Sequence, residues 1–156
     1  MQKATFAAGC FWGVEDAFRK VPGVLDAVSG YIGGQKDEPT YKEVCGGRTN
    51  HAEAVEVTFD ESKVSFEDLL NVFWKIHDPT QKNRQGPDVG TQYRSAVFVH
   101  DENQKQAAED AIASLNAAGK SPRPIATEVV EAPTFWRAEE YHQRYHEKHG
   151  GSCHIF

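Results

Sequence analysis

The sequence lacks a long hydrophobic run, a basic tract and an even set of cysteines. No apolar stretch approaches the ~20 residues that a membrane-spanning helix needs, so no transmembrane segment is expected. The formal net charge is −6 and no run of Lys and Arg interrupts it, which argues against a nucleic-acid or anionic-membrane partner. The apolar start of the chain, residues 4–12, has no convincing cleavage site and is expected to be a core strand. We therefore expect a cytoplasmic protein without nucleic-acid or membrane partners.

The three cysteines are odd in number and not closely paired, unlike the disulfide framework of a secreted domain. They are Cys10, Cys45 and Cys153, and none belongs to a Cys-x-x-Cys pair. In a reducing compartment such thiols are free, metal-bound or catalytic. Cys153 follows a sequence that contains two glycines, which predicts a flexible arm that can carry this thiol toward another sulfur.

The length and the pattern of the chain predict one domain of the α+β class. Its 156 residues, 39% hydrophobic and 26% charged, are ordinary for a globular protein, and no repeat or linker divides them. We therefore expect a single domain over residues 1–156, with residues 149–156 as a flexible C-terminal arm. The patterns predict strands over residues 4–8, 24–32, 54–59, 94–99 and 127–130, and helices over residues 14–20, 65–74, 101–119 and 138–148. This β-α-β-β-α-β order predicts a two-layer ferredoxin-like sandwich with additional helix and strand elements and a long irregular C-terminal tail.

The sequence Gly9-Cys10-Phe11-Trp12-Gly13 follows the first predicted strand and precedes a helix that we expect to hold Glu15 and Asp16 in its first turn. A thiol at such a turn lies near the positive end of a helix dipole, where backbone N–H groups lower its pKa. Phe11 and Trp12 could line an apolar pocket beside it. The alternative is a small buried cysteine of the core, because free cysteines are often structural.

Two connections are much longer than the usual ~4–6 residues, and long ordered loops often hold functional sites. The first, residues 33–51, contains Tyr41 and Cys45 and leads to His51 and Glu53. The second, residues 77–92, contains His77, Asp78 and Asp88 and ends beside Tyr93. Turn formation and loop packing are the alternative roles for these side chains.

Six short sequences occur in one order along the chain: GCFWG at 9–13, GYIGG at 30–34, PTYKEVC at 39–45, HAEAV at 51–55, FWKIHDPT at 73–80 and GTQYRS at 90–95. Together they closely resemble the A-type peptide methionine sulfoxide reductases, from about residue 4 to at least residue 145. The resemblance implies a catalytic domain that reduces the S epimer of methionine sulfoxide, in oxidised proteins, in peptides or as the free amino acid. It also implies no metal and no organic cofactor, and a thioredoxin-like dithiol as reductant. We expect a monomer.

The resemblance also assigns roles to individual residues. A thiolate attacks the sulfoxide sulfur, the oxygen leaves once protonated, and a second thiol converts the resulting sulfenic acid to a disulfide. Phe11 and Trp12 would bind the S-methyl group of the substrate, and His142 could support the site by hydrogen bonding. The remaining roles implied are Cys10 as nucleophile, Glu53 as proton donor, Tyr41 and Tyr93 as hydrogen-bond donors to the oxygen, Asp88 as a group that orders the site, and Cys153 as the resolving thiol. Glu53 has an alternative role as an exposed carboxylate at the start of a strand.

Three alternatives remain open from the sequence. Relatives often carry two cysteines in a glycine-rich tail, whereas this tail has only Cys153; Cys45 is therefore an alternative resolving thiol, although a structural or bystander role is favoured for it. The tail also contains His142, His146, His149, Cys153 and His154, a set that could bind Zn²⁺ although it matches no standard zinc pattern. A thiol peroxidase that uses Cys10 is the third alternative, and no arginine beside the thiol supports it.

Overall fold

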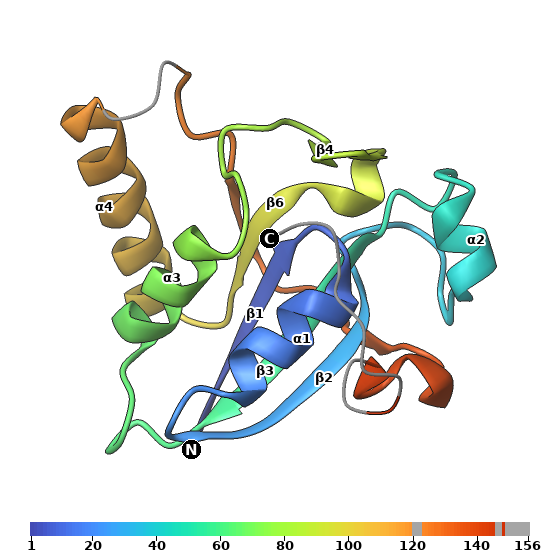
Figure 1. Cartoon of the computed structure of the whole chain (residues 1–156), viewed down its shortest axis with the longest axis horizontal. Helices are drawn as coiled ribbons and strands as arrows, with labels where there is room; N and C mark the ends of the chain where they lie inside the picture. The colour runs from blue at the N-terminus through green and yellow to red at the C-terminus, as the bar shows by residue number, and fades with distance from the viewer. Residues whose placement is uncertain (120–122, 146–147, 149–156) are drawn as a thin grey trace.

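A six-stranded sheet lies at the centre of the computed structural model, which describes residues 1–119, 123–145 and 148 (Figure 1). Its strand order is β7-β6-β1-β3-β2-β8. These strands are β1 (Gln2–Ala8), β2 (Val24–Ile32), β3 (Ala52–Phe59), β6 (Ser95–Val99), β7 (Glu128–Glu131) and β8 (Trp136–Arg137). The helices are α1 (Phe11–Arg19), α2 (Tyr41–Cys45), α3 (Phe66–Lys75) and α4 (Glu102–Ala118), with 3-10 turns η1 (Thr91–Tyr93) and η2 (Glu140–His142). Strands β4 (Arg84–Gln85) and β5 (Asp88–Val89) form a separate small hairpin.

The four central strands, β6-β1-β3-β2, pair antiparallel with one another. This is the order in which a β-α-β-β-α-β chain forms a ferredoxin-like sheet, so the predicted fold class is confirmed. The additional strands extend both edges: β7 pairs parallel with β6, and β8 pairs antiparallel with β2. No helix in the described part of the chain is long and apolar enough to span a bilayer.

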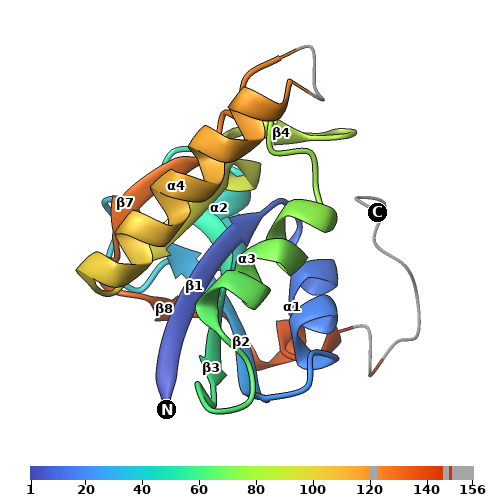
Figure 2. The same cartoon turned by 90° about the vertical axis from the view of Figure 1, so that its left-hand side faces the viewer.

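Helices α1 and α3 cover one face of the sheet, and α4 flanks α3 next to β6 and β7 (Figures 1 and 2). Phe6 of β1 lies at the centre of this layer, with its ring 4.9 Å from that of Phe18 on α1 and 5.3 Å from that of Phe73 on α3. The other face is formed largely by alanines and is covered by the segment around Ala132 and Phe135 rather than by a helix. Successive side chains of β1 point to opposite faces, so Ala4, Phe6 and Ala8 face the helices and Ala7 faces the other side.

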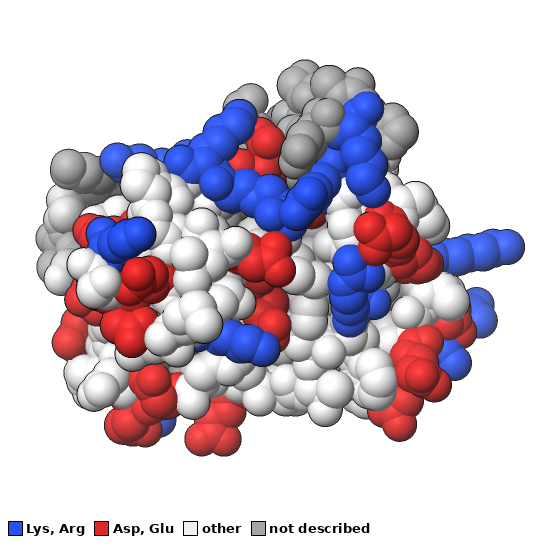
Figure 3. All heavy atoms as spheres, turned by 90° about the horizontal axis from the view of Figure 1, so that it is seen from below, with Lys and Arg blue, Asp and Glu red and all other residues white. Residues whose placement is uncertain are grey.

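Charged side chains of both signs lie on the face seen in Figure 3. Lys and Arg side chains gather along its upper edge, and others are scattered among the Asp and Glu side chains over the rest of that face. That face is therefore mixed in sign, although the chain as a whole is acidic.

Two predicted helix boundaries are wrong. Helix α1 begins at Phe11 with Cys10 as its N-cap residue, so Glu15 and Asp16 lie beyond its first turn. The polar helix predicted over residues 138–148 is not formed over its first part. There the chain makes the short turn η2, and Arg144 has a positive φ of 56°. Hydrogen bonds to α1 and β2 fix this segment in a conformation that is not helical.

Both long connections contain regular structure that the sequence patterns left out. Helix α2 lies within residues 33–51, and its capping box joins Thr40 and Glu43 reciprocally. The β4–β5 hairpin and η1 lie within residues 77–92. One predicted site tyrosine lies in each connection: Tyr41 is the first residue of α2, and Tyr93 is the last residue of η1.

Candidate active site

Cys10 lies at the junction between β1 and α1. Gly9 makes the turn possible, because its φ of 95° is a left-handed conformation that glycine adopts readily. Cys10 then serves as the N-cap residue of α1 and is partly buried. The predicted nucleophile therefore lies at the helix N-terminus, where the dipole and the exposed N–H groups favour negative charge.

Glu53 lies directly beside this helix start. It is the second residue of β3 and is only 1% exposed. Its Oε1 accepts a hydrogen bond of 3.2 Å from the backbone N–H of Phe11, the residue after Cys10. The carboxyl group predicted to donate a proton is therefore buried and bonded to the residue that follows the predicted nucleophile, so the alternative of an exposed carboxylate is excluded.

Two tyrosine hydroxyl groups belong to the same cluster. Burial is the largest cause that raises the pKa of Tyr41 and of Tyr93 well above the usual range, and the negative charge of Glu53 raises both further. The negative charge of the Cys10 thiolate is a smaller cause that also raises the pKa of Tyr93. Because both hydroxyls stay protonated at neutral pH, both are available as hydrogen-bond donors.

Asp88 begins β5 and is half-buried. Its charge is another of the causes that raise the pKa of Tyr93. The β4–β5 hairpin therefore places this carboxylate on the same side as Tyr93, and its role in ordering the site stays a prediction.

Cys45 lies closer to the site than the sequence indicated. It is the last residue of α2, and its thiol takes part in hydrogen bonds with the side chains of both Tyr41 and Tyr93. Burial raises the pKa of this thiol, and the tyrosine hydrogen bonds oppose that change. The backbone carbonyl of Cys45 accepts a hydrogen bond of 3.4 Å from the Gln92 side chain, so the end of α2 is joined to η1.

The aromatic side of the site is built from Phe11, Trp12, Tyr41 and His142. The fully buried His142 ring lies 4.3 Å from the Tyr41 ring and 5.2 Å from the Phe11 ring. Trp12 Nε1 donates a hydrogen bond of 2.9 Å to His142 Nδ1. Since burial also lowers the pKa of His142, its imidazole is a neutral acceptor that holds the indole in place.

Two loop histidines do not join this cluster. His51 Nδ1 accepts from the N–H of Gly34, and its Nε2 donates to the carbonyl of Lys36. His77 is buried between the carbonyl of Phe73 and the hydroxyl of Ser95, and burial lowers its pKa to about 4. Both are neutral structural side chains that fix the ends of their loops.

A carboxylate that sequence reasoning missed fixes the position of α2. Glu139 accepts a hydrogen bond of 2.8 Å from the Tyr31 hydroxyl and another of 2.9 Å from the backbone N–H of Tyr41. It therefore joins β2 and α2 to the C-terminal segment. Its partners lie about a hundred positions away in the chain, and no local pattern signals such contacts.

Comparison with known proteins decides the family. The family model described as "Peptide methionine sulfoxide reductase" matches residues 2–155. The chain belongs to the peptide methionine sulfoxide reductase family. It is a methionine sulfoxide reductase, an oxidoreductase, and the resemblance found in its motifs is confirmed.

Individual relatives of this reductase agree with that assignment. The peptide methionine sulfoxide reductase MsrA of Geobacter sulfurreducens is 58% identical over 154 residues, which cover 98% of this chain and 95% of the relative. Among solved structures, Mxr1 from Saccharomyces cerevisiae in reduced form has a TM-score of 0.89 at 37% identity, with 99% of this chain and 88% of that chain covered. Mxr1 in complex with Trx2 has a TM-score of 0.63 at 26% identity, with 92% of this chain and 84% of that chain covered.

The zinc site suggested for the C-terminal tail can be examined only in the part of the reductase that the structure describes. No group of three or more His, Cys, Asp and Glu side chains there is arranged to hold a metal ion. His142, one member of the suggested zinc set, instead accepts the Trp12 hydrogen bond inside the aromatic cluster. The other four members, His146, His149, Cys153 and His154, lie outside the described residues.

Proposed function

We propose that this enzyme reduces the S epimer of methionine sulfoxide, protein-bound or free, with Cys10 as the nucleophile. The Cys10 thiolate attacks the sulfoxide sulfur and forms a transient sulfur–sulfur bond. The sulfur–oxygen bond of the substrate then breaks, the oxygen passes to Cys10, and the sulfur–sulfur bond breaks as methionine leaves. In balance, a thiol and a sulfoxide become a cysteine sulfenic acid and the thioether of methionine. The cycle requires no metal and no organic cofactor.

Glu53 is proposed as the proton donor to the oxygen of the sulfoxide. The observation that carries this proposal is its hydrogen bond to the Phe11 N–H, which holds a carboxyl group that is 1% exposed beside Cys10. Tyr41 and Tyr93, protonated at neutral pH, would donate hydrogen bonds to the same oxygen as negative charge develops on it. Asp88 would order Tyr93 and the polar side of the pocket.

The preference for the S epimer would follow from the aromatic groups on one side of the site and the polar groups on the other. Phe11 and Trp12 would contact the S-methyl group, since sulfur and its methyl substituent pack favourably on aromatic rings. The hydroxyl and carboxyl groups would bind the oxygen. The opposite epimer, with its methyl group on those rings, would direct a polar oxygen away from these donors, which is costly in an apolar environment.

Recycling is proposed to use Cys153 as the resolving thiol. Its attack on the Cys10 sulfenic acid forms a Cys10–Cys153 disulfide and releases water. A thioredoxin would then reduce this disulfide by thiol–disulfide exchange. This partner is supported by the similarity to Mxr1, whose structure in complex with Trx2 has been solved.

An epimer-resolved assay tests this function. The purified protein is incubated with thioredoxin, thioredoxin reductase and NADPH, and with a methionine sulfoxide peptide as separate S and R epimers. We expect the S peptide to be reduced at least about 100-fold faster, because the wrong epimer would leave buried polar groups unpaired. Equal rates for the two epimers would contradict the assignment of the aromatic and polar sides of the pocket.

A further inference from the structure

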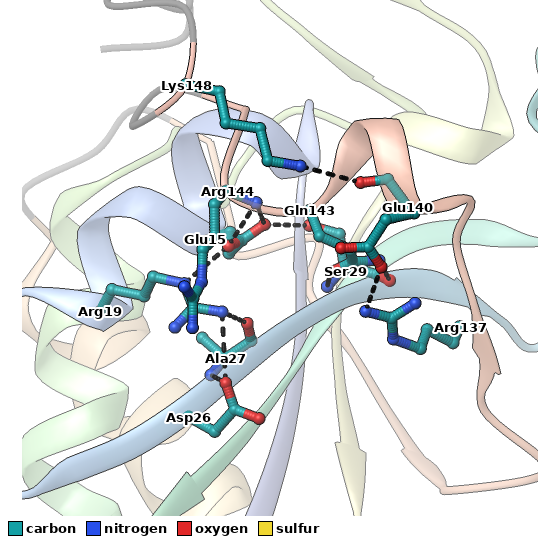
Figure 4. A network of polar contacts seen from close by, with 10 residues as sticks. All are labelled: Glu15, Arg19, Asp26, Ala27, Ser29, Arg137, Glu140, Gln143, Arg144 and Lys148. Carbon is teal, nitrogen blue, oxygen red and sulfur yellow. Dashed lines mark hydrogen bonds and ion pairs between the residues drawn. The ribbon is translucent and has the colours of Figure 1, made fainter.

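The proposed cycle does not use Glu15, although it is one of the most completely buried charged residues, with 1% exposed. Figure 4 shows its carboxylate where α1, β2 and the C-terminal segment meet. It accepts a hydrogen bond of 2.7 Å from Arg19 Nε and one of 2.8 Å from the Ser29 hydroxyl. Both of its oxygens also lie within hydrogen-bond distance of the Arg144 backbone N–H, at 3.0 Å and 2.9 Å. The carboxylate therefore joins the C-terminal segment to the helix that begins at Cys10.

The side chain of Gln143 makes a second connection at the same point. Its Oε1 accepts from the backbone N–H of Ser29 at 2.9 Å, and its Nε2 donates to the carbonyls of Ser29 and Ala138 at 2.9 Å and 3.0 Å. Arg19 extends the network to Asp26 and to the carbonyl of Ala27. The turn at Arg144 is therefore attached to β2 through the Gln143 amide and to α1 through the Glu15 carboxylate (Figure 4).

The Glu15 bonds stabilise an otherwise unfavourable backbone turn. Arg144 has a φ of 56°, a conformation that costs on the order of 1 kcal/mol for a residue other than glycine. Immediately after this turn, the ring of Tyr145 stacks on that of Trp12 at 3.8 Å and 9°. The chain therefore turns at Arg144 toward the end of α1 that holds Cys10.

We infer that Glu15 is a positioning residue for recycling: it fixes the origin of the C-terminal arm beside Cys10, so that Cys153 meets the sulfenic acid efficiently. This inference rests on the proposed role of Cys153. Cys153 is nine positions after Arg144 in the sequence, so the chain between them spans at most roughly 30 Å. Glu15 is five residues along α1 from Cys10, a rise of about 7.5 Å. Because an intramolecular reaction depends on the effective concentration of the tethered group, the position where the tether begins affects its rate.

The variant Glu15→Gln tests this role with little change in shape. Arg19 Nε and the Arg144 N–H can only donate, so a glutamine amide places one NH₂ group against a donor and loses an acceptor. We expect methionine formation in a single turnover to stay within about twofold of wild type. We expect the following Cys10–Cys153 disulfide formation to slow about tenfold, the effect of losing one charge-assisted hydrogen bond at the tether. Rapid quench with mass spectrometry measures the two steps separately.

Matched variants separate positioning from general damage. Asp16→Asn removes the same charge from the next residue of α1, where the carboxylate pairs with Lys20 at 2.9 Å, and should leave both steps unchanged. Arg144→Gly keeps the backbone N–H and favours the positive φ, so disulfide formation should stay at the wild-type rate. Gln143→Leu releases the same segment from β2 and should reproduce the slowing seen in Glu15→Gln.

Two outcomes would overturn the positioning role of Glu15, and a third would also overturn the role of Cys153. An unchanged rate of disulfide formation in Glu15→Gln overturns the positioning role. Equal slowing of methionine formation and disulfide formation also overturns it, because Glu15 would then support Cys10 itself. If the wild-type protein forms methionine but no Cys10–Cys153 disulfide, the proposed resolving thiol is wrong, and the role inferred for Glu15 is wrong with it.

Discussion

Replacement of Glu53 by glutamine is expected to slow methionine formation in a single turnover by about 100-fold or more, the usual contribution of a positioned general acid. The amide oxygen of glutamine can still accept the hydrogen bond from the Phe11 N–H, so the start of α1 should keep its geometry. The amide cannot release a proton to the sulfoxide oxygen as a carboxylic acid does. Quenched-flow measurement of methionine with excess enzyme isolates this step from recycling.

The dependence of the rate on pH identifies the lost group. Loss of a general acid should remove one ionisation from the pH profile of the single-turnover rate, so the profiles of wild type and Glu53→Gln should differ. Glu56→Gln is a matched control on the same strand, because Glu56 pairs with Lys3 at 3.3 Å. A Glu53→Gln rate within threefold of wild type, with the same pH profile, would remove Glu53 from the proton-donor role.

Replacement of Cys153 by serine should separate the reductive step from recycling. We expect this variant to form methionine once per chain at the wild-type rate, because the site around Cys10 and Glu53 is intact. Turnover with thioredoxin should fall about 100-fold or more, since the intramolecular attack that forms the disulfide is lost. A coupled NADPH assay measures turnover, and a dimedone-type probe that reacts with sulfenic acids measures the accumulated Cys10 intermediate.

Cys45→Ser is the matched control for this experiment. A serine hydroxyl can replace the thiol in the hydrogen bonds with Tyr41 and Tyr93, so recycling should continue. The contacts of Cys45 also make it the alternative resolving thiol within the described residues. If Cys153→Ser turns over normally with thioredoxin, and a Cys10–Cys45 disulfide is found, Cys45 is the resolving residue instead.

The central fold could be predicted from the sequence because its signals are local. The strands alternate in pattern, and a local capping box of Ser65 and Asp68 begins α3 where the helix is expected. Asp101 likewise caps α4, and Gly119 ends it in the left-handed conformation. These elements, taken in order, were sufficient for the ferredoxin-like arrangement.

Helix α2 was missed although its signal was present. Thr40 and Glu43 have the spacing of a capping box, but the helix is only five residues long and lies in a glycine-rich connection. Once α2 is recognised, Tyr41 and Cys45 are four positions apart on one helix face. The sequence therefore contained the information that associates Cys45 with the site.

The C-terminal segment could not be predicted from local pattern. Its polar composition suits a helix, yet Arg144 bonds to Glu15 and Gln143 bonds to Ser29, across 129 and 114 positions of the chain. His142 and Trp12 are separated by 130 positions. Contacts of this kind override helix propensity, because several buried hydrogen bonds outweigh a preference of a few tenths of a kcal/mol per residue.

The most direct test of the account is a single turnover of the fully reduced protein with the S epimer of a methionine sulfoxide peptide, followed by mass-spectrometric mapping of every cysteine. We expect about one methionine per chain and a disulfide between Cys10 and Cys153, with no methionine formed by Cys10→Ser. Methionine formation by Cys10→Ser at the wild-type rate, or a product disulfide that omits Cys10, would contradict it.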